Sequence, residues 1–309
     1  MNPATKLPIH GVFCAAATPV LEGGSPDHPA FAAHCHALLH EGCHGIALLG
    51  TTGEANSFSL SQRHELLTKL IEAGVDATRL MPGTSQTNVP DTIGLTRHAV
   101  EAGVAATVLL PPFFYKGVSD EGLFRFYAEV IEGVGSDRLR VVLYHIPPIA
   151  QVGISAELVS RLREAFPGIV VGIKDSSGKL ESMEAFARGF ASFAVFAGAD
   201  PLMLPLLRTG GAGCITSSSN LIAAHLRVIF DGWSEPSAQE RVIKAQERIE
   251  AWRDLSNAYV QLPTIKAMLA RRRGHPGWTR VRPPLVELTP PEIDRVWSMM
   301  SELEDAQND

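Results

Sequence analysis

One lysine stands where a buried strand is predicted to end. Lys174 follows the apolar, β-branched run at 169–173 and precedes the turn-forming residues 175–178. Desolvation at such a position favours the neutral amine, a nucleophile that condenses with a ketone or aldehyde to give a Schiff base. Most lysines at strand ends instead reach water or pair with a neighbour, here Asp175. Imine chemistry therefore needs support from other motifs.

A glycine-rich turn supplies the first support. Gly50-Thr51-Thr52-Gly53-Glu54 directly follows a second strand-like run at 45–49. Glycines on both sides of two threonines let the backbone turn tightly and direct N–H groups and hydroxyls at an anion such as a carboxylate. In isolation the motif is equally compatible with a turn whose threonines satisfy local backbone groups.

A tyrosine supplies the second support. Tyr144 ends the β-branched run at 140–143, just before the proline stop at Pro147. A phenol at this place can move protons during carbinolamine formation and carbon–carbon cleavage. The alternative is a core tyrosine with a satisfied hydroxyl.

The strand pattern brings these residues together. Strand-like runs lie at 11–18, 44–50, 79–84, 105–111, 140–147, 169–175, 193–198 and 212–217, with helical stretches between them. Eight β–α units predict an α/β fold, a (β/α)8 TIM barrel, whose chemistry sits at the carboxyl ends of the strands. Thr51, Tyr144 and Lys174 end the second, fifth and sixth predicted strands, so we expect one shared mouth.

Helical signals frame the strands and fill the rest of the chain. Ser59 and Gln62 form a predicted capping box, and Gly74 and Gly103 are predicted helix stops. After about residue 220 only helical periodicity remains, so we expect a barrel at 1–224 and a C-terminal helical region at 225–309 packed on it. Residues 282–284 are predicted to link into a last helix near 290–303, and the arginines at 271–273 to form a solvated helix end.

The three motifs, in this order and spacing, resemble those of the pyruvate-dependent class I aldolases, the family of dihydrodipicolinate synthase and N-acetylneuraminate lyase. The resemblance covers residues 8–300. It implies that Lys174 forms the Schiff base, that Tyr144 handles protons, and that Thr51 and Thr52 bind the carboxylate. It also implies no cofactor beyond the covalent imine, a homotetramer, and further pocket positions at Gly50, Gly53, Gly198, Asp200, Ile215 and Ser217.

Departures from the family pattern fall where its members differ in their second substrate. Ile149 stands where synthases have a carboxylate-binding arginine, which removes a charge-assisted clamp. Phe114 stands where synthases send a relay tyrosine from a neighbouring subunit, and Tyr115 is adjacent. Sialic acid lyases carry a glutamate after the pocket aspartate, but Asp200 is followed by Pro201. The aldehyde partner therefore stays open, with a hint of a less charged molecule.

The resulting hypothesis is a metal-independent lyase that makes or cleaves a carbon–carbon bond between pyruvate, or another 2-oxo acid, and an aldehyde. A carbon–oxygen lyase, which dehydrates its substrate, is also open. Enzymes that act on keto-deoxy sugar acids or on aryl-pyruvates are the family members most compatible with these departures. The alternatives are 4-hydroxy-tetrahydrodipicolinate synthase, N-acetylneuraminate lyase, and a barrel that binds a 2-oxo acid without turning it over. Loss of the relay tyrosine at Phe114 favours the last alternative, and retention of Lys174 and Tyr144 opposes it.

Other patterns bound the function. His36 and His40 lie one helical turn apart, but the apolar stripe through Cys35 and Leu38 predicts that both face solvent, so no metal site is expected. The glycines at 210–213 favour tight backbone packing over a phosphate cradle. The net charge of −6 predicts no nucleic acid, and no apolar run is long enough to cross a membrane. Four cysteines without a CxxC pair, and no signal-peptide pattern, predict a cytoplasmic protein.

Overall fold

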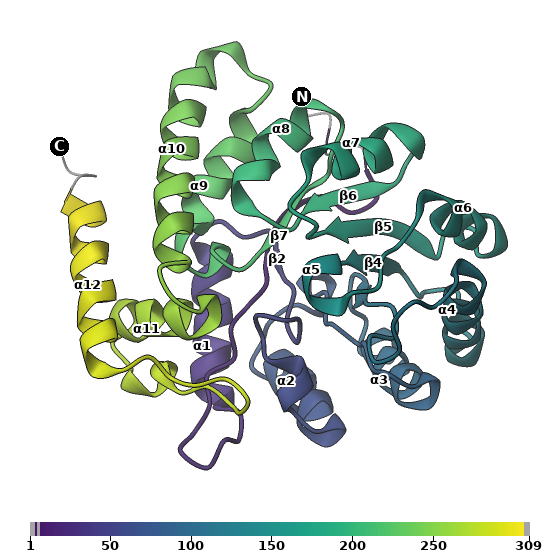
Figure 1. The fold of residues 1–309 in the computed structure, drawn as a ribbon, viewed down its shortest axis with the longest axis horizontal. Coiled ribbons are helices and arrows are strands. Elements are labelled where there is room, and N and C mark those ends of the chain that lie inside the picture. Colours follow the sequence, from purple (N-terminus) through teal and green to yellow (C-terminus); the bar gives the residue numbers. More distant parts are fainter. Residues whose placement is uncertain (1–3, 5–6, 306–309) are drawn as a thin grey trace.

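A curled parallel sheet forms the centre of the protein, and helices surround it (Figure 1). The computed structural model describes residue 4 and residues 7–305, so the outer limits of the two expected regions, residues 1 and 309, lie outside the described residues. The sheet order is β2-β1-β7-β6-β5-β4-β3. Its strands within the described residues are β1 Gly11–Cys14, β2 Gly45–Ile46, β3 Thr107–Leu109, β4 Val141–His145, β5 Val170–Asp175, β6 Ala194–Ala197 and β7 Gly213–Thr216.

The strand predicted at 79–84 is present only as isolated bridges, and it completes the ring between β2 and β3. Leu80 pairs with Ile46, and Gly83 pairs with Val108, both in parallel. Pro82 has no N–H to donate, so a regular ladder is interrupted there. A Cβ on Gly83 would lie 2.2 Å from the Leu49 carbonyl oxygen, so only glycine fits this approach. The prediction of eight regular strands was therefore wrong, while the barrel itself is confirmed.

Buried Arg63 compensates for this irregular segment. Its Nη2 donates to the Gly83 carbonyl at 2.9 Å, and its Nη1 donates to the Ser85 carbonyl at 3.1 Å. Burial lowers the pKa of Arg63 to about 10. Carbonyls that a regular neighbour strand would satisfy are thus satisfied by a guanidinium from the helix outside the barrel.

Two hydrophobic groups of side chains hold the barrel. One lies inside the ring, where Phe13 and Phe196 meet edge to face with centroids 5.7 Å apart, and it also includes Tyr144 and Ile215. The other lies between the sheet and the surrounding helices. Side chains alternate between the two faces along each strand, so every second residue points into the barrel. The inner group of side chains therefore extends up to the mouth.

The surrounding helices begin and end where the sequence signals place them. Ser59 forms the predicted capping box with Gln62, and Gly74 and Gly103 have positive φ just after their helices. The helices are α1 His28–His40, α2 Leu60–Glu72, α3 Val89–Glu101, α4 Asp120–Val134, α5 Pro147–Ala150, α6 Ala156–Ala165, α7 Leu180–Gly189, α8 Met203–Arg208, α9 Ser219–Gly232, α10 Gln239–Ser256, α11 Gln261–Arg273 and α12 Pro290–Asp305. Short 3-10 turns occupy Ala55–Ser57, Ala77–Arg79, Asp200–Leu202, Pro236–Ala238 and Pro276–Thr279.

The last three helices gather on one side of the barrel (Figure 1). The expected boundary at residue 224 falls inside α9, so we propose to divide the chain after Gly232.

The prediction of a solvated helix end at residues 271–273 was wrong. Arg271 binds the Trp297 carbonyl in α12, Arg272 binds the Leu221 carbonyl in α9, and Arg273 contacts Glu41 at 2.7 Å. Arg272 and Arg273 hold the helical region to the barrel, and Arg271 joins two helices within that region.

Two further expectations concern glycines and membrane spans. Gly213 has φ of 135°, and a Cβ there would lie 2.0 Å from the Gly11 carbonyl oxygen, which favours the packing interpretation. Among the helices of the described residues, none is both long enough and apolar enough to span a bilayer.

Candidate active site

Lys174 and Tyr144 are neighbours inside the barrel. They are register partners on the parallel strands β5 and β4. The Lys174 Nζ lies 4.1 Å from the centroid of the Tyr144 ring. Only 6% of Lys174 and 4% of Tyr144 is exposed. The predicted strand ends therefore deliver an amine and a phenol to the same buried place.

The residues that follow them point to the opposite face of the sheet. Asp175 accepts from the Ser177 N–H at 2.7 Å and from the Ser182 hydroxyl at 2.6 Å. His145 Nδ1 accepts from the Ile154 N–H at 3.0 Å. Asp175 thus fixes the turn after β5, and the alternative in which it pairs with Lys174 is wrong.

The glycine-rich turn approaches Tyr144 from β2. The Thr51 hydroxyl and the Tyr144 hydroxyl are 3.2 Å apart, within hydrogen-bond distance. A Cβ on Gly53 would lie 3.0 Å from the Leu49 nitrogen and 3.1 Å from the Ala16 carbonyl oxygen. The glycine lets the turn fold back on the first strand and present its threonines to the mouth.

Two opposing influences set the acidity of Tyr144. Burial raises the pKa of the phenol. The neighbouring Lys174 charge, together with hydrogen bonding to Thr51, Lys174 and Ser176, lowers it more, so the pKa of Tyr144 lies below its ordinary value. A phenol with a lowered pKa gives up its proton more readily, which suits a group that exchanges protons with a reacting oxygen or carbon.

A cavity of about 290 Å³ opens above these residues. That size is near the lower end for small-molecule sites. Seven residues predicted from sequence line it: Thr51, Thr52, Tyr144, Ile149, Lys174, Gly198 and Ser217. The remaining lining residues are Ile146, Pro148, Ser176, Ser177, Gly178, Ala199, Arg253 and Gln261.

The other predicted residues lie around this cavity. Gly50 lines a smaller adjoining cavity of about 30 Å³, together with Thr51 and Tyr144. Gly53 is buried within the turn, and Ile215 belongs to the barrel interior. Asp200 is fully buried behind the cavity wall, and Phe114 is 70% exposed on a loop.

The comparisons with known proteins agree along the whole chain. A model of the Dihydrodipicolinate synthetase family matches residues 8–303. The chain belongs to this family. A relative from Chloroflexus aurantiacus, named an uncharacterized DapA-like lyase, is 32% identical over 284 residues, 92% of this chain and 93% of the relative. The 4-hydroxy-tetrahydrodipicolinate synthase of Agrobacterium fabrum is 32% identical over 289 residues, 92% of this chain and 94% of that enzyme.

Solved structures of the family share the fold. Dihydrodipicolinate synthase from Agrobacterium tumefaciens matches with a TM-score of 0.87 at 30% identity, covering 95% of this chain and 99% of that chain. The prophage protein YagE from E. coli K12, determined in complex with pyruvate, matches with a TM-score of 0.86 at 23% identity, over 96% and 98% of the two chains, which supports the fold alone. This family member is a lyase of the class I aldolase type.

Sequence reasoning missed the residues that the C-terminal helices of this family member bring to the mouth. Arg253 from α10 and Gln261 from α11 line the cavity, and Gln261 Oε1 accepts from the Ser217 hydroxyl at 3.2 Å. Arg253 lies in a helix rich in charge, so no signal in the sequence distinguishes it from its neighbours.

A buried ion pair links α11 to the glycine-rich turn. Lys266 Nζ lies 2.6 Å from Glu54 Oε1, and both side chains are fully buried. The Arg282 N–H donates to the second Glu54 oxygen at 2.8 Å. Lys266 carries the single charge in the stretch 255–270, and that isolation was an available signal for a buried partner.

Two histidines of α1 face solvent, as predicted. His36 and His40 are exposed, while Cys35 and Leu38 on the same helix are buried. Within the described residues, no group of three or more His, Cys, Asp and Glu side chains comes together as a metal site would require.

Proposed function

We propose that this protein forms a Schiff base between Lys174 and pyruvate, or another 2-oxo acid, and joins it to or releases it from an aldehyde. The observation that carries the proposal is the placement of one buried amine against a phenol, with two threonine hydroxyls at the same cavity. Binding of a carboxylate alone gives no reason to bury an amine beside a phenol, because burying a charged group is costly.

The 2-oxo acid carboxylate would bind at Thr51 and Thr52. Backbone N–H groups of a glycine-flanked turn, with the threonine hydroxyls, suit an anion with several acceptor oxygens. The Thr51–Tyr144 hydrogen bond supports this assignment, because a carboxylate bound at Thr51 would lie beside the phenol. The ketone carbon would then lie within reach of the Lys174 amine.

The covalent sequence follows from these positions. The amine nitrogen adds to the ketone carbon, the oxygen takes up two protons and leaves as water, and a protonated imine remains. In cleavage, the C3–C4 bond breaks, its electron pair enters the enamine, and C4 departs as an aldehyde once its hydroxyl has lost a proton. Tyr144 is the group we assign to these proton transfers, because it contacts Lys174 and Thr51. Synthesis is the same path reversed.

The aldehyde half would occupy the part of the cavity toward Ile149. This residue is 62% exposed at the rim of the cavity. It stands at the position where the family resemblance gives synthases an arginine. Keto-deoxy sugar acids and aryl-pyruvates are the substrates we propose, ahead of synthesis of 4-hydroxy-tetrahydrodipicolinate or cleavage of N-acetylneuraminate.

We propose a homotetramer as well, in which the exposed Phe114 and Tyr115 lie between subunits; both are at least 70% exposed in the single chain. The four cysteines are free and buried, which supports a cytoplasmic setting.

Borohydride trapping tests the imine directly. The protein is incubated with pyruvate and borohydride, and intact and peptide masses are measured for wild type and for Lys174→Ala as the control. We expect a reduced adduct on the peptide that contains Lys174 in wild type, and no adduct at that position in the variant. Pyruvate binding by calorimetry without any adduct would instead support a non-catalytic 2-oxo acid-binding barrel.

A further inference from the structure

The cavity contains a second cation, and it comes from outside the barrel. Arg253 lies near the carboxyl end of α10 and lines the same cavity as Lys174. Among the described residues that line this cavity, Lys174 and Arg253 are the ones that carry charge, and carboxylates are missing from that lining set. An anion that enters the cavity therefore meets two positive groups.

The guanidinium of Arg253 is held by one edge. Its Nη1 lies 3.4 Å from Asp200 Oδ2 and 3.4 Å from the Ser217 hydroxyl. Among the described residues, Nε and Nη2 make no hydrogen bond. A guanidinium carries its donors as a planar fork, so a contact through one nitrogen leaves the other edge available for a carboxylate or phosphate.

Neutralising Asp200 is not a sufficient role for this arginine. Asp200 is fully buried, yet its Oδ1 has no hydrogen-bond partner among the described residues. A pair built for mutual neutralisation would make two short parallel bonds, whereas this contact is single and long. The arginine side chain is also 24% exposed, so it faces the cavity while Asp200 supports it from behind.

We propose that Arg253 binds an anionic group at the end of the substrate far from the imine carbon. The substrate is then a 2-oxo acid with a second acidic group, or the matching aldehyde acid, and Gln261 and Ser217 contact the same end. This assignment rests on the proposed imine at Lys174. It replaces the sequence-based hint of a less charged partner, because α10 supplies the cation that is missing at Ile149. Of the substrates proposed above, it favours keto-deoxy sugar acids that carry a second acidic group over aryl-pyruvates.

Matched 2-oxo acids test the assignment without knowledge of the natural aldehyde. Borohydride trapping on Lys174 is measured as a function of concentration for two pairs of equal chain length: 2-oxoglutarate with 2-oxopentanoate, and 2-oxoadipate with 2-oxohexanoate. In wild type we expect the dicarboxylic member of at least one pair to half-saturate at a concentration about tenfold or more below its partner, from one charge-assisted contact. Equal half-saturation in both pairs would overturn the assignment.

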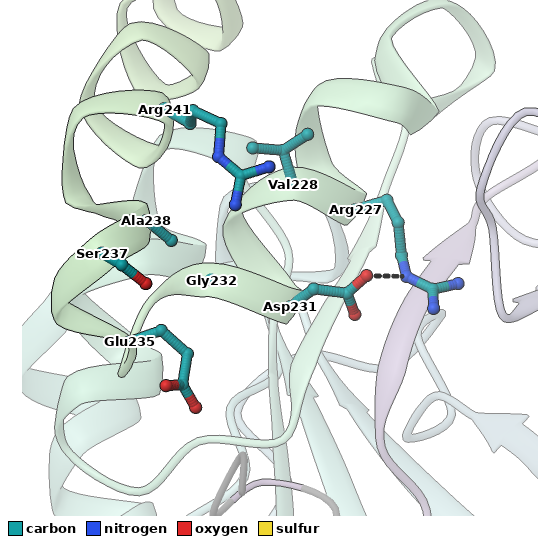
Figure 2. Close-up of a pocket in the computed structure, with 8 residues that line it drawn as sticks. All are labelled: Arg227, Val228, Asp231, Gly232, Glu235, Ser237, Ala238 and Arg241. Carbon is teal, nitrogen blue, oxygen red and sulfur yellow. Dashed lines mark hydrogen bonds and ion pairs between the residues drawn. The ribbon is translucent and has the colours of Figure 1, made fainter.

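Variants separate a binding role from a structural one. Arg253→Gln should remove the preference within the pair, and Arg253→Lys should restore part of it, because it keeps the charge but loses the fork. The control is Arg241→Gln. Arg241 lies on the same helix but faces a separate cavity of about 250 Å³ between α9 and α10 (Figure 2). The preference should survive this change. If the preference persisted in Arg253→Gln, another residue would hold the distal anion.

Failure of the parent proposal gives a different result. If pyruvate itself leaves no adduct on Lys174 in wild type, the imine is absent and the proposed function fails. If pyruvate is trapped but the dicarboxylic acids show no advantage, only the role of Arg253 fails. Circular dichroism of each variant at the assay temperature checks that a lost preference does not reflect unfolding.

Discussion

Removing the Lys266 ammonium should destabilise the protein and loosen the turn that we propose binds the substrate carboxylate. Lys266→Met keeps most of the side-chain volume but leaves the Glu54 carboxylate buried without its cation. Burial lowers the pKa of Lys266, and the Glu54 charge only partly offsets this. The ion pair is therefore a costly arrangement that is stable only while both members are present.

The size of the effect follows from the contacts of Glu54. Removing one partner of a fully buried ion pair costs about 3–5 kcal/mol. Glu54 keeps the hydrogen bond from the Arg282 N–H at 2.8 Å, which compensates part of the loss. We therefore expect a decrease of about 3 kcal/mol in the free energy of unfolding. Because Glu54 ends the turn that carries Thr51 and Thr52, the pyruvate concentration for half-saturation of trapping should also rise.

A double-variant cycle checks this reasoning. Urea unfolding is measured for wild type, Lys266→Met, Glu54→Gln and the double variant. If the pair acts as described, the double variant loses less than the sum of the single losses by about 2 kcal/mol, since neither buried charge is then left alone. Additive losses, with a coupling below about 0.5 kcal/mol, would show that the two residues contribute independently and would refute the argument.

Three further changes probe the site and the fold. Tyr144→Phe removes the phenol that we propose carries protons and should slow imine formation roughly 10²–10⁴-fold in stopped-flow trapping, with the adduct still on Lys174. Gly53→Ala places a methyl group 3.0 Å from the Leu49 nitrogen and should destabilise the protein by about 1–3 kcal/mol in urea unfolding. Burial lowers the pKa of His34 from 6.5 to about 3, so its contribution to stability is complete above pH 6.5 and is lost as the pH falls toward 3.

Controls accompany these three measurements. Tyr127→Phe removes a buried phenol on α4 whose hydroxyl has no hydrogen-bond partner among the described residues, and it should leave the trapping rate unchanged; an equal loss in both tyrosine variants would contradict the role of Tyr144. Gly94→Ala lies in α3 with open space around its Cβ position and should not destabilise the protein as Gly53→Ala does. For His34, the variant His34→Gln should flatten the pH dependence of unfolding between pH 6.5 and 3, and an unchanged curve would assign the acid sensitivity elsewhere.

The proximity of Lys174 and Tyr144 was predictable because it follows from strand alternation. Lys174 and Tyr144 end β-branched runs, and two neighbouring parallel strands bring such ends to one mouth. Ser59, Gly74 and Gly103 likewise act through local backbone chemistry that a short stretch of sequence contains. Each of these predictions depends on a few consecutive residues and on a period that the sequence displays.

The unpredicted features depend on contacts between distant segments. Arg63 stabilises an irregular strand through carbonyls about twenty residues away, and nothing near Arg63 announces this. Lys266 meets Glu54 across 212 positions, and Arg253 meets Asp200 across 53. The arginines at 271–273 form a charged run of the kind that usually faces solvent, yet packing of α11 against α9 and α12 determined their partners.

Two parts of the chain contribute side chains to the mouth: the strand ends of the barrel, and the helices α10 and α11. Strand ends of the barrel hold the amine, the phenol and the carboxylate turn, whereas Arg253 and Gln261 belong to helices added after the last strand. If Arg253 and Gln261 select the partner as proposed, exchange of residues 239–273 between relatives should transfer that selection and leave Lys174 and Tyr144 in place. In such chimeras, α10 and α11 would determine which partner is accepted, and the barrel would keep the same residues at its strand ends.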